Sequence, residues 1–163
     1  MKKKLIALLL LVTCSFCITS CAVVPAYDSS ELIHILDRKG YDVEIINEVS
    51  EEGISGYLYA NNPETGEKLY YIYCEDIRSA QSIYRYINSQ RKAKIAEIKM
   101  EIEKVEYSLY KGENSTAAQK GDYYEKYLLL KEQLDEVQNY GCGHGLNVVW
   151  YGTKQAIMDI RLG

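Results

Sequence analysis

The sequence has no excess of basic residues. Lysine and arginine together number 19 against 23 aspartate and glutamate residues, and the formal net charge is −4. An acidic chain has little electrostatic attraction for nucleic-acid phosphates or for anionic lipid headgroups. The composition therefore argues against a nucleic-acid partner.

Motifs that hold metals, phosphates or cofactors are also scarce. The chain has two histidines, and Cys142 and His144 form a single Cys-x-His pair. Tetrahedral zinc sites usually combine two paired ligand motifs, so a metal here needs Cys74 or His34 as well. The stretch 151–154 has one glycine and neither Walker nor dinucleotide spacing, so we interpret it as a capped turn. No cofactor is expected.

Long apolar runs are missing except at the start of the chain. Three lysines at positions 2–4 precede the unbroken apolar run 5–12. This order is typical of the first two regions of an export signal. Apolar character fades after Ile18, well short of the ~20 residues that a transmembrane helix needs. The segment therefore predicts export and not a membrane-spanning helix.

The export signal closes on Ile18, Thr19, Ser20 and Cys21. This closing tetrapeptide resembles the lipobox of bacterial lipoproteins. The resemblance implies that a diacylglyceryl group is attached to the sulfur of Cys21 and that a dedicated signal peptidase cuts just before it. Two acyl chains are the usual minimum for lasting attachment. A lipid-anchored protein on the extracytoplasmic face of the cell membrane is the implied location. The resemblance covers residues 1–21, and the rest of the chain resembles no family known to us.

Other processing sites are weaker. Cys17 follows the bulky Phe16, and modification at Cys14 would leave too short an apolar core. Ordinary cleavage after Ala22, which would release a soluble secreted protein, remains the alternative.

Cleavage before Cys21 defines the mature chain. Loss of residues 1–20 leaves 143 of 163 residues and moves the formal charge from −4 to −7, since three lysines and no acidic residue are removed. We expect a tether at 21–28 and a single domain at 29–163, long enough for a real core. Cys74 and Cys142 then remain beside Cys21. An oxidising compartment favours a disulfide between them, and two free, half-buried thiols are the alternative.

Hydrophobic periodicity predicts an α+β fold. The expected elements are a helix at about 29–39 capped by Asp28, strands at 41–46, 54–60 and 69–74, a helix from Asp76, a strand at 146–151 buried on both faces, and a last helix capped by Thr153. Residues 140–145, rich in glycine, are expected to form a loop. These elements indicate a four-stranded, mainly antiparallel sheet with helices on one face.

Two heptad seams interrupt this pattern. The apolar positions are 95, 98, 102, 105 and 109 in the first seam and 123, 127, 130, 134 and 137 in the second. Seams spaced three and four residues apart are typical of paired helices. We therefore expect an inserted antiparallel helical hairpin at about 92–139.

Tyrosine is abundant, with sixteen residues. Tyr57, Tyr59, Tyr71 and Tyr73 recur at period two on two neighbouring expected strands. One sheet face is therefore expected to carry a tyrosine patch, either for sugar or peptide recognition or as ordinary cross-strand packing.

These features favour binding over catalysis. Our leading hypothesis is a membrane-anchored envelope lipoprotein that binds or scaffolds a protein partner through the helical hairpin or the tyrosine-rich face. An envelope thiol or hydrolytic enzyme using Cys142, His144 and Cys74 is the rival from another class. A small solute-capture lipoprotein is the third possibility.

Overall fold

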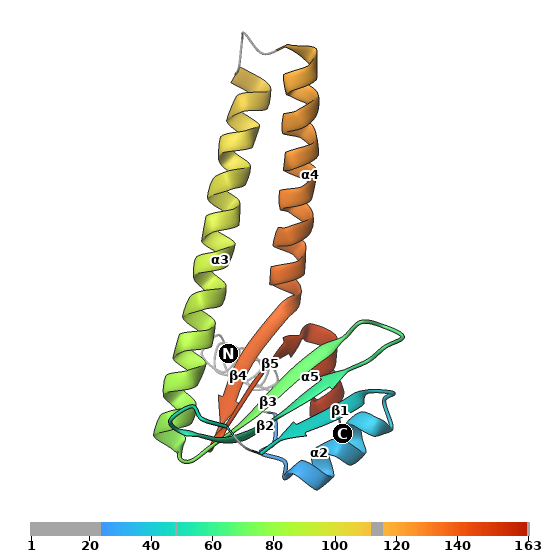
Figure 1. The fold of residues 1–163 in the computed structure, drawn as a ribbon, viewed down its shortest axis with the longest axis vertical. Coiled ribbons are helices and arrows are strands. Elements are labelled where there is room, and N and C mark those ends of the chain that lie inside the picture. Colours follow the sequence, from blue (N-terminus) through green and yellow to red (C-terminus); the bar gives the residue numbers. More distant parts are fainter. Residues whose placement is uncertain (1–23, 48, 112–115, 163) are drawn as a thin grey trace, which may run out of the picture.

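The computed structural model describes residues 24–47, 49–111 and 116–162 (Figure 1). The expected signal peptide at 1–20 and the expected lipidation site, Cys21, lie outside these residues. The described elements follow the order α2 Ser29–Asp37, β1 Asp42–Ile46, β2 Ile54–Asn61, β3 Lys68–Cys74, α3 Ile77–Lys111, α4 Ala117–Asn139, β4 Tyr140–Gly145, β5 Val148–Thr153 and α5 Lys154–Arg161. The α+β class predicted from the sequence is confirmed.

The sheet has five strands, in the order β1-β2-β3-β5-β4, and every neighbouring pair is antiparallel. The prediction of four strands is wrong because the expected loop at 140–145 is strand β4. The glycines of β4 are there because neighbouring side chains leave no room for a Cβ atom. A Cβ atom on Gly143 would lie 2.6 Å from the Trp150 ring, and one on Gly141 would lie 3.0 Å from Ile157. Glycine in a strand often marks such a close approach of a neighbour.

Helices cover both faces of the sheet, so the expectation of helices on one face is also wrong. Leu58 and Tyr71 belong to the main core with residues of α2 and α5. Cys74 and Val149 belong to a second cluster with Ala80 of α3, on the opposite face. The reason lies in β5, whose residues Val148, Val149 and Trp150 are all buried. A strand buried on both faces needs a layer on each side.

Polar side chains fix the starts of the helices. Asp28 accepts a hydrogen bond from the backbone N–H of Glu31 at 2.9 Å, which confirms the predicted cap of α2. Asp76, which directly precedes α3, accepts a hydrogen bond from the backbone N–H of Ser79 at 2.7 Å. Thr153 is the N-cap residue of α5, but its side chain makes no capping bond. Its hydroxyl instead accepts from the N–H of Lys68 on β3 at 3.2 Å.

The two heptad seams form a helical arm that rises from the sheet (Figure 1). α3 runs without a break from the second sheet face into this arm, and α4 returns alongside it. All ten predicted seam positions lie in one cluster, with Ile98, Ile102, Val105, Leu130 and Leu134 buried. Among the residues that the structure describes, a surface ion pair between Lys126 and Glu101 at 3.8 Å also joins the helices. Within the described residues, no helix combines the length and the apolar character needed to cross a bilayer.

Candidate functional site

Cys74 and Cys142 lie on the sheet face that α3 covers, and both are free thiols. Cys142 pairs with Tyr151, which pairs with Tyr70. Cys74 lies four residues beyond Tyr70 on β3, a displacement of roughly 13 Å at ~3.3 Å per residue. A disulfide needs Cα atoms within about 7 Å. Bridging these two cysteines would therefore require the sheet to rearrange.

Both thiols are held in the protonated form. Burial, and secondarily the charge of Asp76, raises the pKa of Cys74 from 9.0 to about 11. Burial also raises the pKa of Cys142, although Arg91 and Lys92 act in the opposite direction. The thiolate is the nucleophilic form of cysteine. Neither thiol is therefore activated near neutral pH.

The two histidines lie on different faces of the fold. His144 follows Cys142 by two residues on β4, and its ring packs against Tyr84 of α3, with centroids 4.8 Å apart. His34 is exposed on α2, which covers the other face. His34 is therefore too far from Cys142 and His144 to complete a metal site with them. No cluster of three or more histidine, cysteine, aspartate or glutamate side chains suited to a metal occurs in the described residues.

The predicted tyrosine patch is wrong in its members because of the strand register. Tyr57 pairs with Ile72, and Tyr59 pairs with Tyr70. Tyr57 and Tyr59 consequently point to the α3 side of the sheet, whereas Tyr71 and Tyr73 point to the α2 and α5 side. A one-residue difference in register moves a side chain to the other face.

A different row of tyrosines crosses the sheet. Tyr59, Tyr70, Tyr151 and Tyr140 come from β2, β3, β5 and β4, with successive ring centroids 4.8, 6.3 and 5.1 Å apart. Burial raises the pKa of Tyr70, Tyr140 and Tyr151. The sequence alone does not predict Tyr70, Tyr140 and Tyr151 as members of this row, because the glycine-rich stretch 140–145 predicts a loop and the order of the strands is not encoded locally.

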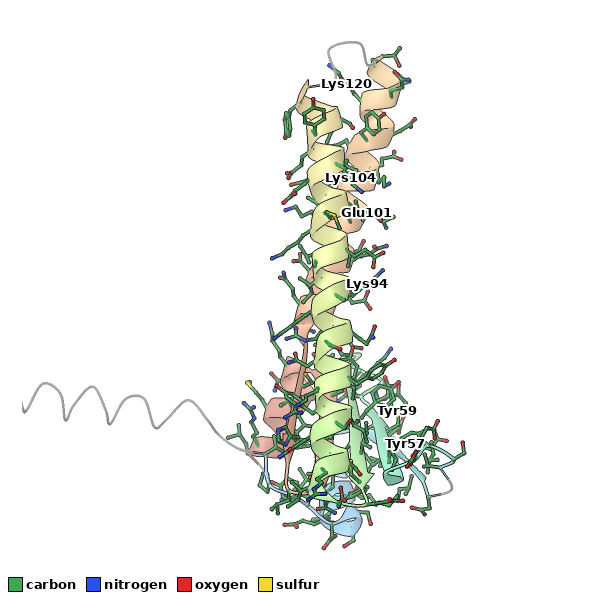
Figure 2. All side chains as sticks on the ribbon, turned by 90° about the vertical axis from the view of Figure 1, so that its left-hand side faces the viewer. Tyr57, Tyr59, Lys94, Glu101, Lys104 and Lys120 are labelled. Carbon is green, nitrogen blue, oxygen red and sulfur yellow. The ribbon has the colours of Figure 1, made fainter. Side chains whose placement is uncertain are left out.

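An apolar groove of about 420 Å³ adjoins this row at the base of α3. Figure 2 labels Tyr57 and Tyr59 beside the lower end of α3. The groove is lined by Val49, Glu51, Ile54, Tyr57, Tyr70, Ile72, Ile87 and Tyr151.

The opposite face has a cleft of about 470 Å³ beside the start of α2. Its lining includes polar groups of Tyr73, Asn47, Ser55 and Asn147. The buried hydroxyl of Tyr73 has no hydrogen-bond partner among the described residues. Burial, with a smaller contribution from the charge of Asp28, raises the pKa of Tyr73 to about 12. This hydroxyl therefore stays neutral at physiological pH and is able to donate a hydrogen bond.

The arm carries apolar side chains on its outside as well as along its seam. On α4, Tyr124, Leu128 and Leu129 are 56%, 49% and 55% exposed, while Leu130 and Leu134 are buried against α3. α4 therefore presents apolar groups both to α3 and to solvent. A helix that only supported the hairpin would carry polar residues on its outer side.

Comparisons with models of protein families, with curated proteins and with solved structures found no match. The functional argument therefore depends on the residues and geometry described above.

Proposed function

We propose that this protein is a membrane-anchored envelope lipoprotein whose helical arm binds another envelope protein without catalysis. The lipid on Cys21 holds the chain at the extracytoplasmic face of the membrane. The sheet forms the base, and the arm formed by α3 and α4 supplies the contact surface. The observation that carries the proposal is the exposed apolar group of Tyr124, Leu128 and Leu129 on α4.

The character of this surface suits a protein partner. Contiguous exposed apolar patches on soluble proteins often mark interaction sites, and tyrosine is enriched at interface cores. The flanking residues Glu125 and Lys126 are exposed and of opposite sign. Lys126 pairs with Glu101 of α3 at 3.8 Å, so it borders the apolar group on the side of that helix. The tyrosine row on the sheet is already packed ring against ring, so we assign the partner contact to the arm.

The chemistry of the thiols supports a binding role over the rival thiol enzyme. Cys74 lies far along the sheet from Cys142, and the pKa of each thiol is raised by burial. An enzyme nucleophile generally needs a lowered pKa or an adjacent base. The ring of His144, the candidate base, is packed against Tyr84.

The test is recovery of the intact anchored protein with its partners, after mild cross-linking of cells and solubilisation in detergent. The double variant Leu128→Glu, Leu129→Glu should lose the proteins that copurify with the parent, because two charges then replace exposed apolar contacts. Leu146→Glu is the matched control, since Leu146 is 65% exposed in the β4–β5 turn, away from the arm. An unchanged set of copurified proteins in the double variant would refute binding through α4.

Capture of a small solute is a second candidate, supported by the cleft around Tyr73. An unpartnered buried hydroxyl is costly unless a ligand or another group satisfies it. Native mass spectrometry of protein purified from its own cells should then detect a small bound molecule, and Tyr73→Phe should abolish that adduct while leaving the circular dichroism spectrum unchanged. Absence of an adduct on the parent protein, or its persistence in Tyr73→Phe, would count against capture in this cleft.

A further inference from the structure

α3 carries a second seam, on the side turned away from α4. The seam residues are spaced 3-4-3-4-3-4-3, and all are exposed: Tyr86, Ser89, Ala93, Ala96, Met100, Glu103, Tyr107 and Tyr110. Seven of the eight are uncharged, although charged residues dominate the remaining outer positions of the helix. Figure 2 views the arm from this side, with α4 behind α3. We call these eight residues the outer seam.

The outer seam has the dimensions of a helix-binding surface. Met100 and Tyr107 are 54% and 66% exposed, and with Glu103, Lys104 and Ser108 they line a shallow groove of about 490 Å³. A 3-4 repeat of apolar residues over more than three heptads is the signature of a helix that packs along another helix, and six of the eight outer-seam residues are apolar. The inner seam packs against α4, and the outer seam lies on the opposite side of α3.

We propose that the outer seam binds the outer seam of a second copy of this chain, with the two α3 helices antiparallel. The size of the side chains selects the register. When Ala93 lies opposite Tyr110 of the second copy, Ala96 lies opposite Tyr107 of the second copy, and Met100 lies opposite its Glu103. Each tyrosine then meets an alanine, as close packing requires, and the two middle layers pair Met100 with Glu103. The overlap covers residues 93–110, roughly 27 Å at ~1.5 Å per residue.

The charges beside the seam fit the same register. Glu97 flanks the seam on one side and falls beside Lys104 of the second copy. Lys99 flanks it on the other side and falls beside Glu106 of the second copy. Symmetry repeats each attraction, so four pairs of opposite charge border the interface. Complementary charges at these flanking positions set partner choice and orientation in paired helices.

A parallel arrangement fits less well. It places Glu103 opposite itself at the interface and brings Lys99 beside Lys104 of the second copy. It also sets Ala93 and Ala96 opposite their own copies, which leaves gaps where the antiparallel register places tyrosine rings. Buried like charges and cavities both destabilise an interface. The antiparallel register is therefore the one that the sequence and the exposed surface support.

This interface goes beyond the proposed function, because it uses α3 and leaves the exposed group on α4 to the envelope partner. Failure of one proposal does not affect the other, since each has its own variants. The two-fold symmetry also closes the assembly at two copies. A self-complementary surface used once by each chain gives a dimer without an open-ended filament.

Sedimentation of the full chain in mild detergent tests for the dimer. The parent should sediment as two protein copies per particle, and the double variant Ala96→Glu, Met100→Glu should sediment as one. Leu128→Glu on α4 is the matched control and should stay dimeric. Circular dichroism checks that the helices are intact. A monomeric parent, or a dimer that survives the change in the outer seam, would overturn the proposal.

Charge exchange tests the register. Glu97→Lys should weaken the dimer on the order of tenfold, because it turns two attractive pairs into repulsive ones. The double variant Glu97→Lys, Lys104→Glu should restore the parent affinity, because the exchanged charges again face opposite signs. An equally weak double variant would contradict this register.

Cysteine cross-linking tests the orientation. A mixture of differently tagged Ala96→Cys and Tyr107→Cys chains should form a mixed adduct with a short bismaleimide, while Ala96→Cys chains alone should form none. The parent chain controls for the natural cysteines. Cross-linking of Ala96→Cys to itself would indicate parallel helices and overturn the antiparallel arrangement.

Discussion

At the scale of single residues, the cysteines show how burial controls reactivity. Cys74 is 2% exposed at the end of β3, and the thiol has no cationic neighbour among the causes that shift its pKa. Cys142 is half-buried at the edge of the sheet, close to Arg91. The two residues looked equivalent in the sequence. Their environments differ because β3 is an inner strand and β4 is an edge strand.

We predict that the stability of the fold decreases at alkaline pH, in part because of Cys74. Its pKa is raised from 9.0 to about 11 in the folded chain. The folded state therefore favours the protonated thiol. That contribution is fully present below pH 9 and is lost as the pH rises through about 11. Urea unfolding at pH 8 and pH 11 should show a smaller loss of stability for Cys74→Ala than for the parent. Equal losses would contradict the assigned pKa.

The glycines of the edge strand give a second residue-scale prediction. Gly143→Ala should destabilise the fold by about 1–3 kcal/mol, because the new methyl group would overlap the Trp150 ring. Gly121→Ala, in the exposed part of α4 where a Cβ meets nothing within 4 Å, should stabilise it by about 0.5–1 kcal/mol. Urea midpoints measure both changes. A tolerated Gly143→Ala would show that β4 does not lie against Trp150 as described.

At the scale of elements, local sequence signals were sufficient where one element depends on its own residues. The cap at Asp28, the ten seam positions of the arm and the burial of Val148, Val149 and Trp150 were all predictable. Strand β4 was not predictable from its own residues. Its glycines are explained only by the tertiary contacts with Trp150 and Ile157. The tyrosine row was not predictable for a similar reason. Its members are joined by strand register and strand order, which no local pattern encodes.

The arm should unfold separately from the sheet. Its cluster of buried residues shares no member with the main core. Leu134→Ala removes a buried contact between α3 and α4, at a cost of about 2–5 kcal/mol. Amide hydrogen exchange should therefore become faster in the arm and stay unchanged in β2 and β3. Leu128→Ala, at an exposed position of the same helix, is the control with little expected effect. Equal acceleration in the sheet after Leu134→Ala would indicate a single cooperative unit.

At the scale of the whole molecule, the described residues form a sheet and an arm, and we propose an anchor before them. The sheet is covered by α2 and α5 on one face and by α3 on the other, so most of its apolar surface is already used. The arm instead leaves apolar side chains exposed on both of its helices. Binding surfaces are therefore expected on the arm. The proposed lipid on Cys21 and the expected tether at 21–28 would keep the sheet close to the bilayer.

The anchor is the central claim, and the mass of the N-terminal peptide of the protein from its own cells tests it most directly. We predict a mature chain that begins at Cys21 and carries a diacylglyceryl group on its sulfur. The variant Cys21→Ser should lack the lipid and leave the detergent phase on partitioning. A parent chain that begins at residue 23, with no lipid and in the soluble fraction, would contradict the account.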